Sequence, residues 1–573
     1  MTDLPWLTIL GIVPLVGALV VAALPNGRDA LAKQVALLVS LVVLGLTIAM
    51  CAAFDPDGDR FQFTQAYDWI PAFGVQYAVG ADGIALVLIA LIAVLVPVVV
   101  LASWYDADPQ ADPLRREVSA GAAAAAAAGA GSSASSRRVG GGATAVLEAP
   151  PVPPAEQPVD ELPPRRSVKT FFALLLVLET MMIGVFAATD VFLFYVFFEA
   201  MLIPMYFIIG SYGGPRRSYA AMKFLLYSLF GGLLMLAAVI GLFVVSASQG
   251  EGTFAFEQLL GLHESMSTTV EIALFSGFFI AFAIKAPLFP FHTWLPDAGA
   301  EAPVGGAVLL VGVLDKVGTF GFLRYCLPLF PEASRILGPY VIALCVIGIL
   351  YGALLAMGQK DLKRLVSYTS VAHFGFIAMG VFAFTTQGQT GAVLYMVNHG
   401  LSTGALFLVV GFLVVRGRSR LIPDYSGVAG VAPILAGTFL VAGLSSLALP
   451  GLSTFVSEFL VLLGTYSRYP VAAVLGAIGV ILAALYVLLM YQRTMQGPLR
   501  LPALLGERMR DLHLREVLAV APLIALMLVL GVYPKPLTDV INPAVEATMQ
   551  DIGQTDPAPT QGDGVVAGAE NED

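Results

Sequence analysis

The sequence predicts an all-α integral membrane protein with about fourteen transmembrane helices, and three observations support this fold class. The chain has 573 residues, of which 58% are hydrophobic and only 12% are charged, whereas soluble domains carry about 25% charged residues. Its apolar residues gather in runs of roughly the 20 residues that cross a bilayer. Its basic residues gather in alternate connecting segments. The net charge of −10 gives no indication of a nucleic-acid partner.

Fourteen apolar runs are long enough to span a bilayer. The first lacks the basic region and the small-residue cleavage site of a signal peptide, so we expect it to remain as a helix. The runs lie near residues 4–24, 31–53, 81–104, 169–188, 190–210, 219–246, 270–290, 302–326, 336–357, 362–384, 390–415, 430–466, 471–492 and 514–533.

The distribution of lysine and arginine predicts that both termini lie outside the cytoplasm. With that orientation, 23 of the 30 basic residues fall in cytoplasmic segments. The outer segments hold only Arg60, Arg335, Arg468 and Lys535. Because basic residues concentrate in cytoplasmic loops, this bias supports an even number of spans.

Residues 106–168 differ in composition from the rest of the chain, since they are rich in Ala, Gly, Ser and Pro. Such a segment has little large apolar surface to bury and is expected to remain disordered. A neutral cytoplasmic loop is favoured over a docking arm for a partner, because long surface insertions cost little. The other parts are spans one to three (1–105), spans four to ten (169–384), spans eleven to fourteen (385–540) and a polar acidic tail (541–573).

Four ionisable residues lie inside apolar runs: Glu199, Lys285, Lys316 and Glu458. Insertion scales assign roughly 2.5–3.5 kcal/mol to a Lys or Asp at the centre of a membrane helix. Residues of this kind usually mark a route for ions or protons, or a buried pair. Glu199, among aromatic residues in the fifth run, is therefore a candidate pathway residue rather than a structural acid.

The seventh run has two prolines shortly after its lysine, Pro287 and Pro290. Because proline lacks a backbone N–H and crowds the preceding turn, the helix is expected to break just beyond Lys285. A broken helix at membrane depth persists only when it is buried in protein or lines a wet cavity. A lysine beside such a break favours a proton pathway over a purely structural role in which Lys285 holds helices together.

The polar segment after this break contains Asp297 and Glu301, just before the eighth run. Acidic side chains complement a helix N-terminus, so a capping role is favoured over chemistry. In the eighth run, Asp315 and Lys316 are adjacent and do not form a simple pair along the helix. Lys316 is the candidate pathway residue, and Asp315 is either its counter-ion or faces another helix.

His373 and His399 lie in the tenth and eleventh runs. Histidine titrates nearest physiological pH, which favours a relay over a plain hydrogen bond between helices. In the twelfth run, Pro450 and Gly451 predict a second helix break, and Glu458 follows about two turns later. Two broken helices in separated parts of a chain are typical of inverted-repeat transporters.

Together these residues indicate a proton relay. A Glu199–Lys285 pair that forms and opens would switch Lys285 between holding and releasing a proton. Lys316 and the histidines would carry the proton laterally, and Glu458 would pass it to an exit on the far side.

The three cysteines, Cys51, Cys326 and Cys345, are scattered and form no Cys-x-x-Cys pair. We therefore expect neither a Cys-ligated iron–sulfur cluster nor a zinc site in this chain. The sequence also contains no nucleotide-binding fingerprint.

These residues, in this order, resemble the antiporter-like subunits of respiratory complex I, the NADH:quinone oxidoreductase. The resemblance extends over essentially all fourteen runs, and residues 106–168 have no counterpart. Within the family the chain is most similar to chain M, the bacterial equivalent of mitochondrial subunit four, because chains L and N typically have lysine at the position of Glu458. The strongest stretches are Phe194–Tyr206, Lys285–Pro303, Lys360–Gly375 and Gly451–Glu458.

The resemblance implies an inverted-repeat, antiporter-like fold in a bacterial inner membrane, with proton pumping coupled to electron transfer from NADH to quinone. It implies no redox centre here. FMN, iron–sulfur clusters and quinone would belong to partner subunits, which include the sibling chains L and N. By matching motif, the proton path would consist of Glu199, Lys285, Lys316, His373, His399 and Glu458.

Two other functions remain open at this point. One is a subunit of a multi-chain sodium/proton antiporter, which shares the fold and would use the same buried charges. The other is a structural membrane subunit whose charges only hold helices together. Four buried charges beside two helix breaks disfavour the structural alternative.

Overall fold

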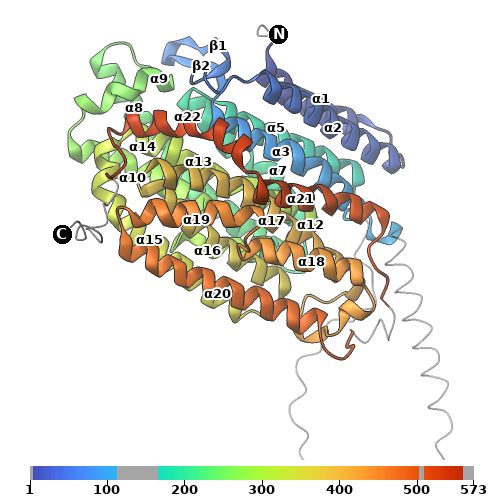
Figure 1. Cartoon of the computed structure of the whole chain (residues 1–573). Helices are drawn as coiled ribbons and strands as arrows, with labels where there is room; N and C mark the ends of the chain where they lie inside the picture. The colour runs from blue at the N-terminus through green and yellow to red at the C-terminus, as the bar shows by residue number, and fades with distance from the viewer. Residues whose placement is uncertain (1–3, 113–165, 502–508, 559–573) are drawn as a thin grey trace, which may run out of the picture.

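The computed structural model describes residues 4–112, 166–501 and 509–558. Long helices lie side by side and approximately parallel in a single bundle (Figure 1). The predicted insertion at 106–168 falls mostly outside the described residues, and so does the last part of the predicted acidic tail.

Thirteen helical segments in the described ranges are long and apolar enough to cross a membrane. They are α1 (Trp6–Ala23), α2 (Asp29–Ala53), α3 (Gly83–Ala102), α5 (Val168–Ala187), α6 and α7 (Val191–Ala200 and Leu202–Tyr212), α8 (Arg217–Gln249), α10 (Thr268–Lys285), α12 to α14 (within Val304–Leu329), α15 (Pro331–Met357), α16 (Leu362–Phe382), α17 (Thr386–Gly417), α20 (Pro470–Met495) and α21 (Leu514–Val532).

Two shorter apolar helices, α18 (Pro433–Ser446) and α19 (Ser453–Tyr466), occupy the place of the predicted run near 430–466. Between them Gly451 has a φ of +92°, a left-handed conformation that favours glycine. The other predicted break is also present, since α10 ends at Lys285, two residues before Pro287. The predicted all-α membrane fold with two broken helices is confirmed.

The helices form a buried inner group and an outer group that faces the surroundings. The most apolar stretch of the Val304–Leu329 segment is entirely buried, and 94% and 89% of the corresponding stretches of α16 and α17 are buried. For α2 and α20 the shares are only 28% and 33%. Since lipid tails are as apolar as Leu, the outer helices can expose hydrophobic side chains while shielding polar groups on the inner ones.

The eighth span is not the uninterrupted helix that its apolar run predicts. It consists of α12 (Val304–Leu309), α13 (Lys316–Gly321) and α14 (Leu327–Leu329), joined by π-helical turns at Leu310–Leu314 and Phe322–Cys326. A π-turn inserts one extra residue and often marks a functional position. Here the first π-turn ends directly before Asp315 and Lys316.

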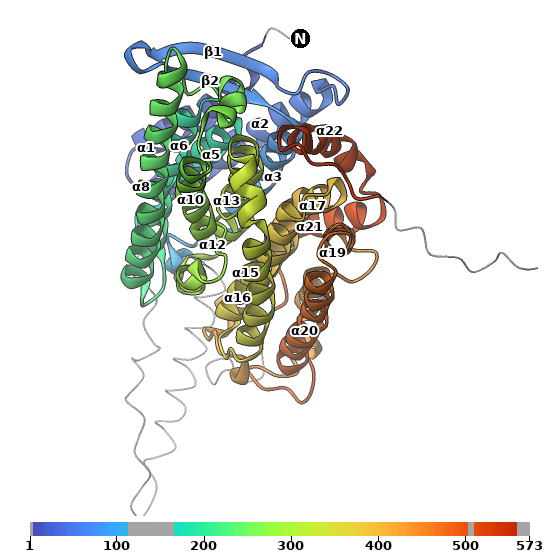
Figure 2. The same ribbon diagram turned by 90° about the vertical axis from the view of Figure 1, so that its left-hand side faces the viewer.

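One end of the bundle carries elements that the apolar runs do not predict. An antiparallel hairpin of β1 (Gln62–Ile70) and β2 (Val75–Ala81) crosses that end, as Figure 2 shows. The same end holds the short helix α9 (Phe256–Leu259) and the amphipathic α22 (Lys535–Asp551) (Figure 1). Helix α22 includes the first residues of the expected polar tail.

A buried ion pair joins the end of α17 to the start of α21. Arg416 donates to both carboxylate oxygens of Glu516, at 2.5 and 3.0 Å, and to the carbonyls of Arg510 and Asp511 at 2.8 and 2.9 Å. Both side chains are 2% exposed. The planar guanidinium therefore holds together a helix end, a connecting segment and a second helix.

We predict that Arg416→Met destabilises the folded subunit by about 3–5 kcal/mol, because it leaves a buried carboxylate without its partner. Chemical denaturation of the purified complex in detergent measures the effect. Arg493→Met, at an exposed position near the end of α20, serves as the control. Equal stability of the two variants would contradict the role assigned to the pair.

Candidate functional site

The six predicted pathway residues come from six different helices, and three of them, Lys316, His373 and His399, lie on the buried inner group. Lys285, Lys316, His373, His399 and Glu458 are each at most 4% exposed, and Glu199 is partly buried. They lie on α6, α10, α13, α16, α17 and α19.

Glu199 lies near the end of α6 and extends its carboxylate over Gly232 of α8. A Cβ atom built on Gly232 would overlap the Oε1 atom of Glu199. Gly232 therefore supplies the space that this carboxylate occupies between the helices.

Lys285 is the last residue of α10, and its side chain is 1% exposed. Its Nζ atom lies 4.6 Å from the ring centroid of Phe198, a cation–π distance. Glu199 and Asp315 both interact with it electrostatically. Among the described residues, however, no side chain accepts a hydrogen bond from this ammonium group. The predicted Glu199–Lys285 pair is thus open in this structure.

The break after Lys285 leaves backbone carbonyls that the protein satisfies in other ways. Pro287 has no N–H, and the N–H of Leu288 reaches back five residues to the carbonyl of Ala283 at 2.9 Å. The carbonyl of Ile284 instead accepts a hydrogen bond from the indole of Trp294 at 2.8 Å. Trp294 therefore anchors the segment after the break to the turn that carries Lys285.

The polar segment after the break is held by ion pairs, and its acids do not cap α12, the helix that begins the eighth span. Asp297 pairs with Lys223 at 2.8 Å and with Arg364 at 2.6 Å. Burial alone would raise the pKa of the Asp297 carboxyl, but hydrogen bonds and the charges of Lys223 and Arg364 hold it below its usual range. Instead, Asp297 lies in the first turn of α11 (Leu295–Glu301), and Glu301 accepts a hydrogen bond from the backbone N–H of Arg216 at the start of α8.

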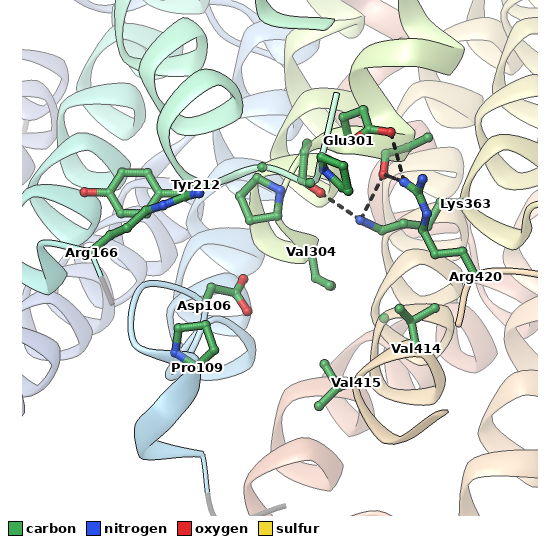
Figure 3. Close-up of a pocket in the computed structure, with 17 residues that line it drawn as sticks. Asp106, Pro109, Arg166, Tyr212, Glu301, Val304, Lys363, Val414, Val415 and Arg420 are labelled. Atoms are coloured by element: carbon green, nitrogen blue, oxygen red, sulfur yellow. Dashed lines mark hydrogen bonds and ion pairs between the residues drawn. The ribbon is translucent and has the colours of Figure 1, made fainter. Parts of the chain in front are cut away.

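Glu301 lies beside a cavity of about 210 Å³, shown in Figure 3. It accepts hydrogen bonds from the backbone N–H of Arg216 at 3.0 Å and from the guanidinium of Arg420 at 3.2 Å. Lys363 donates to the carbonyl of Ala302 at 2.7 Å. These contacts hold the segment that lies between the break and α12. They fix it against α16 and against the residues that follow α17.

His292 belongs to the same segment and was not singled out from the sequence. It is 3% exposed, and its ring stacks on Phe289 at 6.0 Å between centroids. Burial, together with the charge of Lys223, lowers the pKa of His292 to about 4. The imidazole is therefore neutral at physiological pH.

Lys316, the first residue of α13, extends toward α17. Its Nζ atom donates to the carbonyl of Val311 and lies 2.7 Å from Nδ1 of His399. It also lies 5.2 Å from the ring centroid of Phe374. The predicted lysine and histidine are thus in direct hydrogen-bond contact.

Histidine and tyrosine side chains extend from this contact to Glu458. The rings of His399 and His373 are 5.2 Å apart, and those of His373 and Tyr395 are 5.9 Å apart. The Tyr395 hydroxyl donates to Glu458 at 3.3 Å. The Tyr486 hydroxyl lies 3.5 Å from Nε2 of His373. Four predicted residues are therefore joined in one buried cluster.

Sequence reasoning missed Tyr395, Tyr486 and Asn398. Tyr395 precedes His399 by four residues, so both lie on one face of α17, and this spacing was an available signal. Asn398 donates to the carbonyl of Ser453 at 2.7 Å, where α19 begins after the break. For Tyr486, on the neighbouring α20, the sequence holds no comparable signal.

The three cysteines are separate free thiols. Within residues 4–112, 166–501 and 509–558, no three His, Cys, Asp or Glu side chains are grouped so that they could hold a metal ion.

Comparison with known proteins shows the family. The family model described as NADH:quinone oxidoreductase/Mrp antiporter, TM, matches residues 188–485. The NADH-quinone oxidoreductase subunit M of Mycobacterium tuberculosis is 51% identical over 98% of this chain and 97% of its own length. That of Rickettsia prowazekii is 36% identical over 95% and 99%. The chain belongs to the NADH-quinone oxidoreductase subunit M family.

Solved structures agree with this assignment. A chain of respiratory complex I from Thermus thermophilus superimposes with a TM-score of 0.77, at 31% identity over 96% of this chain and all of that one. The Mrp complex from Dietzia sp. DQ12-45-1b gives 0.73 at 19% identity, over 95% and 99%, which shows a shared fold alone. The predicted family and the predicted membership in NADH:quinone oxidoreductase are confirmed, and the antiporter alternative is reduced to a likeness of fold.

We predict that Gly232→Ala lowers proton pumping by about tenfold, because a methyl group would push the Glu199 carboxylate away from its position near Lys285. The variant is compared with the parent by proton uptake into inverted membrane vesicles at matched subunit levels. Gly437→Ala is the control, since a Cβ there has no neighbour within 4 Å. Equal uptake by both variants would show that the placement of Glu199 does not matter.

Proposed function

We propose that this chain translocates protons within the membrane part of NADH:quinone oxidoreductase, driven by electron transfer from NADH to quinone elsewhere in the complex. The proposed route uses Glu199, Lys285, Lys316, His373, His399 and Glu458. A single observation supports it most strongly, which is the buried cluster from Lys316 to Glu458. A row of groups that can each take up and release protons, enclosed inside apolar helices, has little use other than proton transfer.

The Lys316 end of the cluster is suited to direct transfer. A protonated Lys316 donates to Nδ1 of His399, which accepts only as the tautomer protonated at Nε2. At 2.7 Å, a proton can pass along this hydrogen bond without rearrangement of the helices. The resulting imidazolium would lie against His373, the next titratable ring.

At the other end of the cluster, the Tyr395 hydroxyl connects the histidines to Glu458. Tyr395 both donates and accepts hydrogen bonds, so it can give its proton to Glu458 while taking one from the His373 side. Its ring is 5.9 Å from that of His373 between centroids. Small rotations or a bridging water would join the two groups.

At the other end, Glu199 and Lys285 act as a pair that opens and closes. While the pair is open, the ring of Phe198 stabilises the ammonium group of Lys285. A cation–π contact contributes about 2 kcal/mol when it is desolvated. Closure onto Glu199 favours the charged lysine, and opening favours release of its proton. The break after Lys285 and the contact from Trp294 set where this pair can form.

The proposed partners are the other membrane subunits of the complex, including the sibling chains L and N. FMN, iron–sulfur clusters and quinone would reside in partner subunits. The proposed setting is a bacterial inner membrane, with both termini outside the cytoplasm, as the loop charges suggest.

We predict that Lys285→Ala abolishes proton uptake and most quinone-linked NADH oxidation while the complex still assembles. The experiment uses inverted membrane vesicles at matched subunit levels. Loss of both activities is expected because the route is obligatory for turnover. Unchanged uptake and oxidation would refute the pump assignment.

We predict that Tyr395→Phe slows proton uptake by about tenfold or more, since it removes the hydroxyl beside Glu458 and keeps the ring. Tyr340→Phe is the matched control, because Tyr340 is 70% exposed on α15. Vesicle uptake assays compare the two. If both variants pump at the parental rate, the tyrosine does not belong to the route.

A further inference from the structure

Asp315 is a buried carboxylate that the six-residue route does not use. It is 0% exposed. Within the described part of the chain, neither of its carboxylate oxygens has a hydrogen-bond partner. A carboxylate deprived of water and of hydrogen bonds is unfavourable inside apolar surroundings. Its presence therefore calls for a role that offsets this cost.

The first π-turn and the start of α13 direct Asp315 and Lys316 to different neighbours. The backbone N–H of Asp315 reaches back five residues to the carbonyl of Leu310 at 3.2 Å. Adjacent residues on a helix point in different directions. While the ammonium of Lys316 contacts His399, Asp315 interacts electrostatically with both Lys316 and Lys285.

Close packing between α13 and α10 brings Asp315 toward Lys285. A Cβ atom on Gly318 would lie 2.6 Å from the backbone nitrogen of Ala286, the residue after Lys285. Only a residue without a side chain permits this approach. Gly318 follows Asp315 by three residues, so the two share one face of the helix. Asp315 therefore faces the end of α10 that carries Lys285.

We propose that Asp315 carries the proton between Lys285 and Lys316, and this rests on the proposed function. The Lys285 ammonium gives one proton to a carboxylate oxygen of Asp315, which leaves a neutral amine and a neutral carboxylic acid. That acid gives the proton to Lys316 after Lys316 has passed its own to His399. Each step breaks and forms one N–H or O–H bond, and one positive charge moves from Lys285 to Lys316.

The alternative role for Asp315 is a fixed counter-ion, and the two roles require different properties of its side chain. A proton carrier must be able to ionise, whereas a counter-ion must hold the helices together. Because Asp315 has no hydrogen bond to lose, Asp315→Asn should assemble normally. The same substitution removes proton transfer, since an amide does not accept and release protons at physiological pH.

The test compares Asp315→Asn, Asp315→Glu and Lys285→Ala in inverted membrane vesicles, with complex assembly measured in the same membranes. Glu179→Gln is the matched control, because Glu179 is also 0% exposed, and its two carboxylate oxygens lack hydrogen-bond partners among the described residues. We expect Asp315→Asn to lose about tenfold or more of NADH-driven proton uptake. We expect Asp315→Glu to recover much of it and Glu179→Gln to keep most of it.

Each other outcome contradicts the proposal in a distinct way. Normal pumping by Asp315→Asn beside an inactive Lys285→Ala would overturn the role of Asp315 and leave the proposed function intact. Normal pumping by both would overturn the proposed function as well. Failure of Asp315→Asn to assemble, or equal loss in Glu179→Gln, would identify a structural acid instead of a proton carrier.

Discussion

The structure depends on one constraint, which is that ionisable groups inside a bilayer must be enclosed by protein. The outer helices meet it by exposing apolar side chains and surrounding α12 to α14, α16 and α17. Lys316 and His399 can then remain fully buried and yet contact each other at 2.7 Å. The same enclosure separates the row of polar groups from bulk water, which the proposed directed proton transfer requires.

The two helix breaks are subject to the same constraint, since every backbone group that a break frees needs a hydrogen-bond partner at membrane depth. After Lys285 the freed carbonyl of Ile284 accepts a hydrogen bond from the indole of Trp294, and at the start of α19 the carbonyl of Ser453 accepts one from the amide of Asn398, which fixes the helix that resumes after the second break. Each partner is a side chain fixed by its own helix or turn. The breaks are therefore specific points where a functional side chain is held and the helix direction changes, rather than loose segments.

Much of the fold could be predicted from the sequence, because apolar runs of about 20 residues and the prolines beyond Lys285 have direct physical consequences. The π-turns around Asp315 could not, since no proline in residues 304–327 marks an irregularity in the helix. Of the site, the charged residues were evident and Tyr486 was not, because a tyrosine in an apolar run usually belongs to the core. The ion pairs of Asp297 were not predicted, because its partners Lys223 and Arg364 are distant in sequence.

In the proposed route, protons leave through the row of polar groups that ends at Glu458. The most direct test is the number of protons pumped per NADH oxidised by vesicles whose complex carries Glu458→Gln, an uncharged replacement of similar shape. We expect this ratio and the rate of NADH oxidation both to fall while the complex stays assembled. An unchanged ratio at an unchanged rate would show that protons do not pass through Glu458 and would rule out the proposed route.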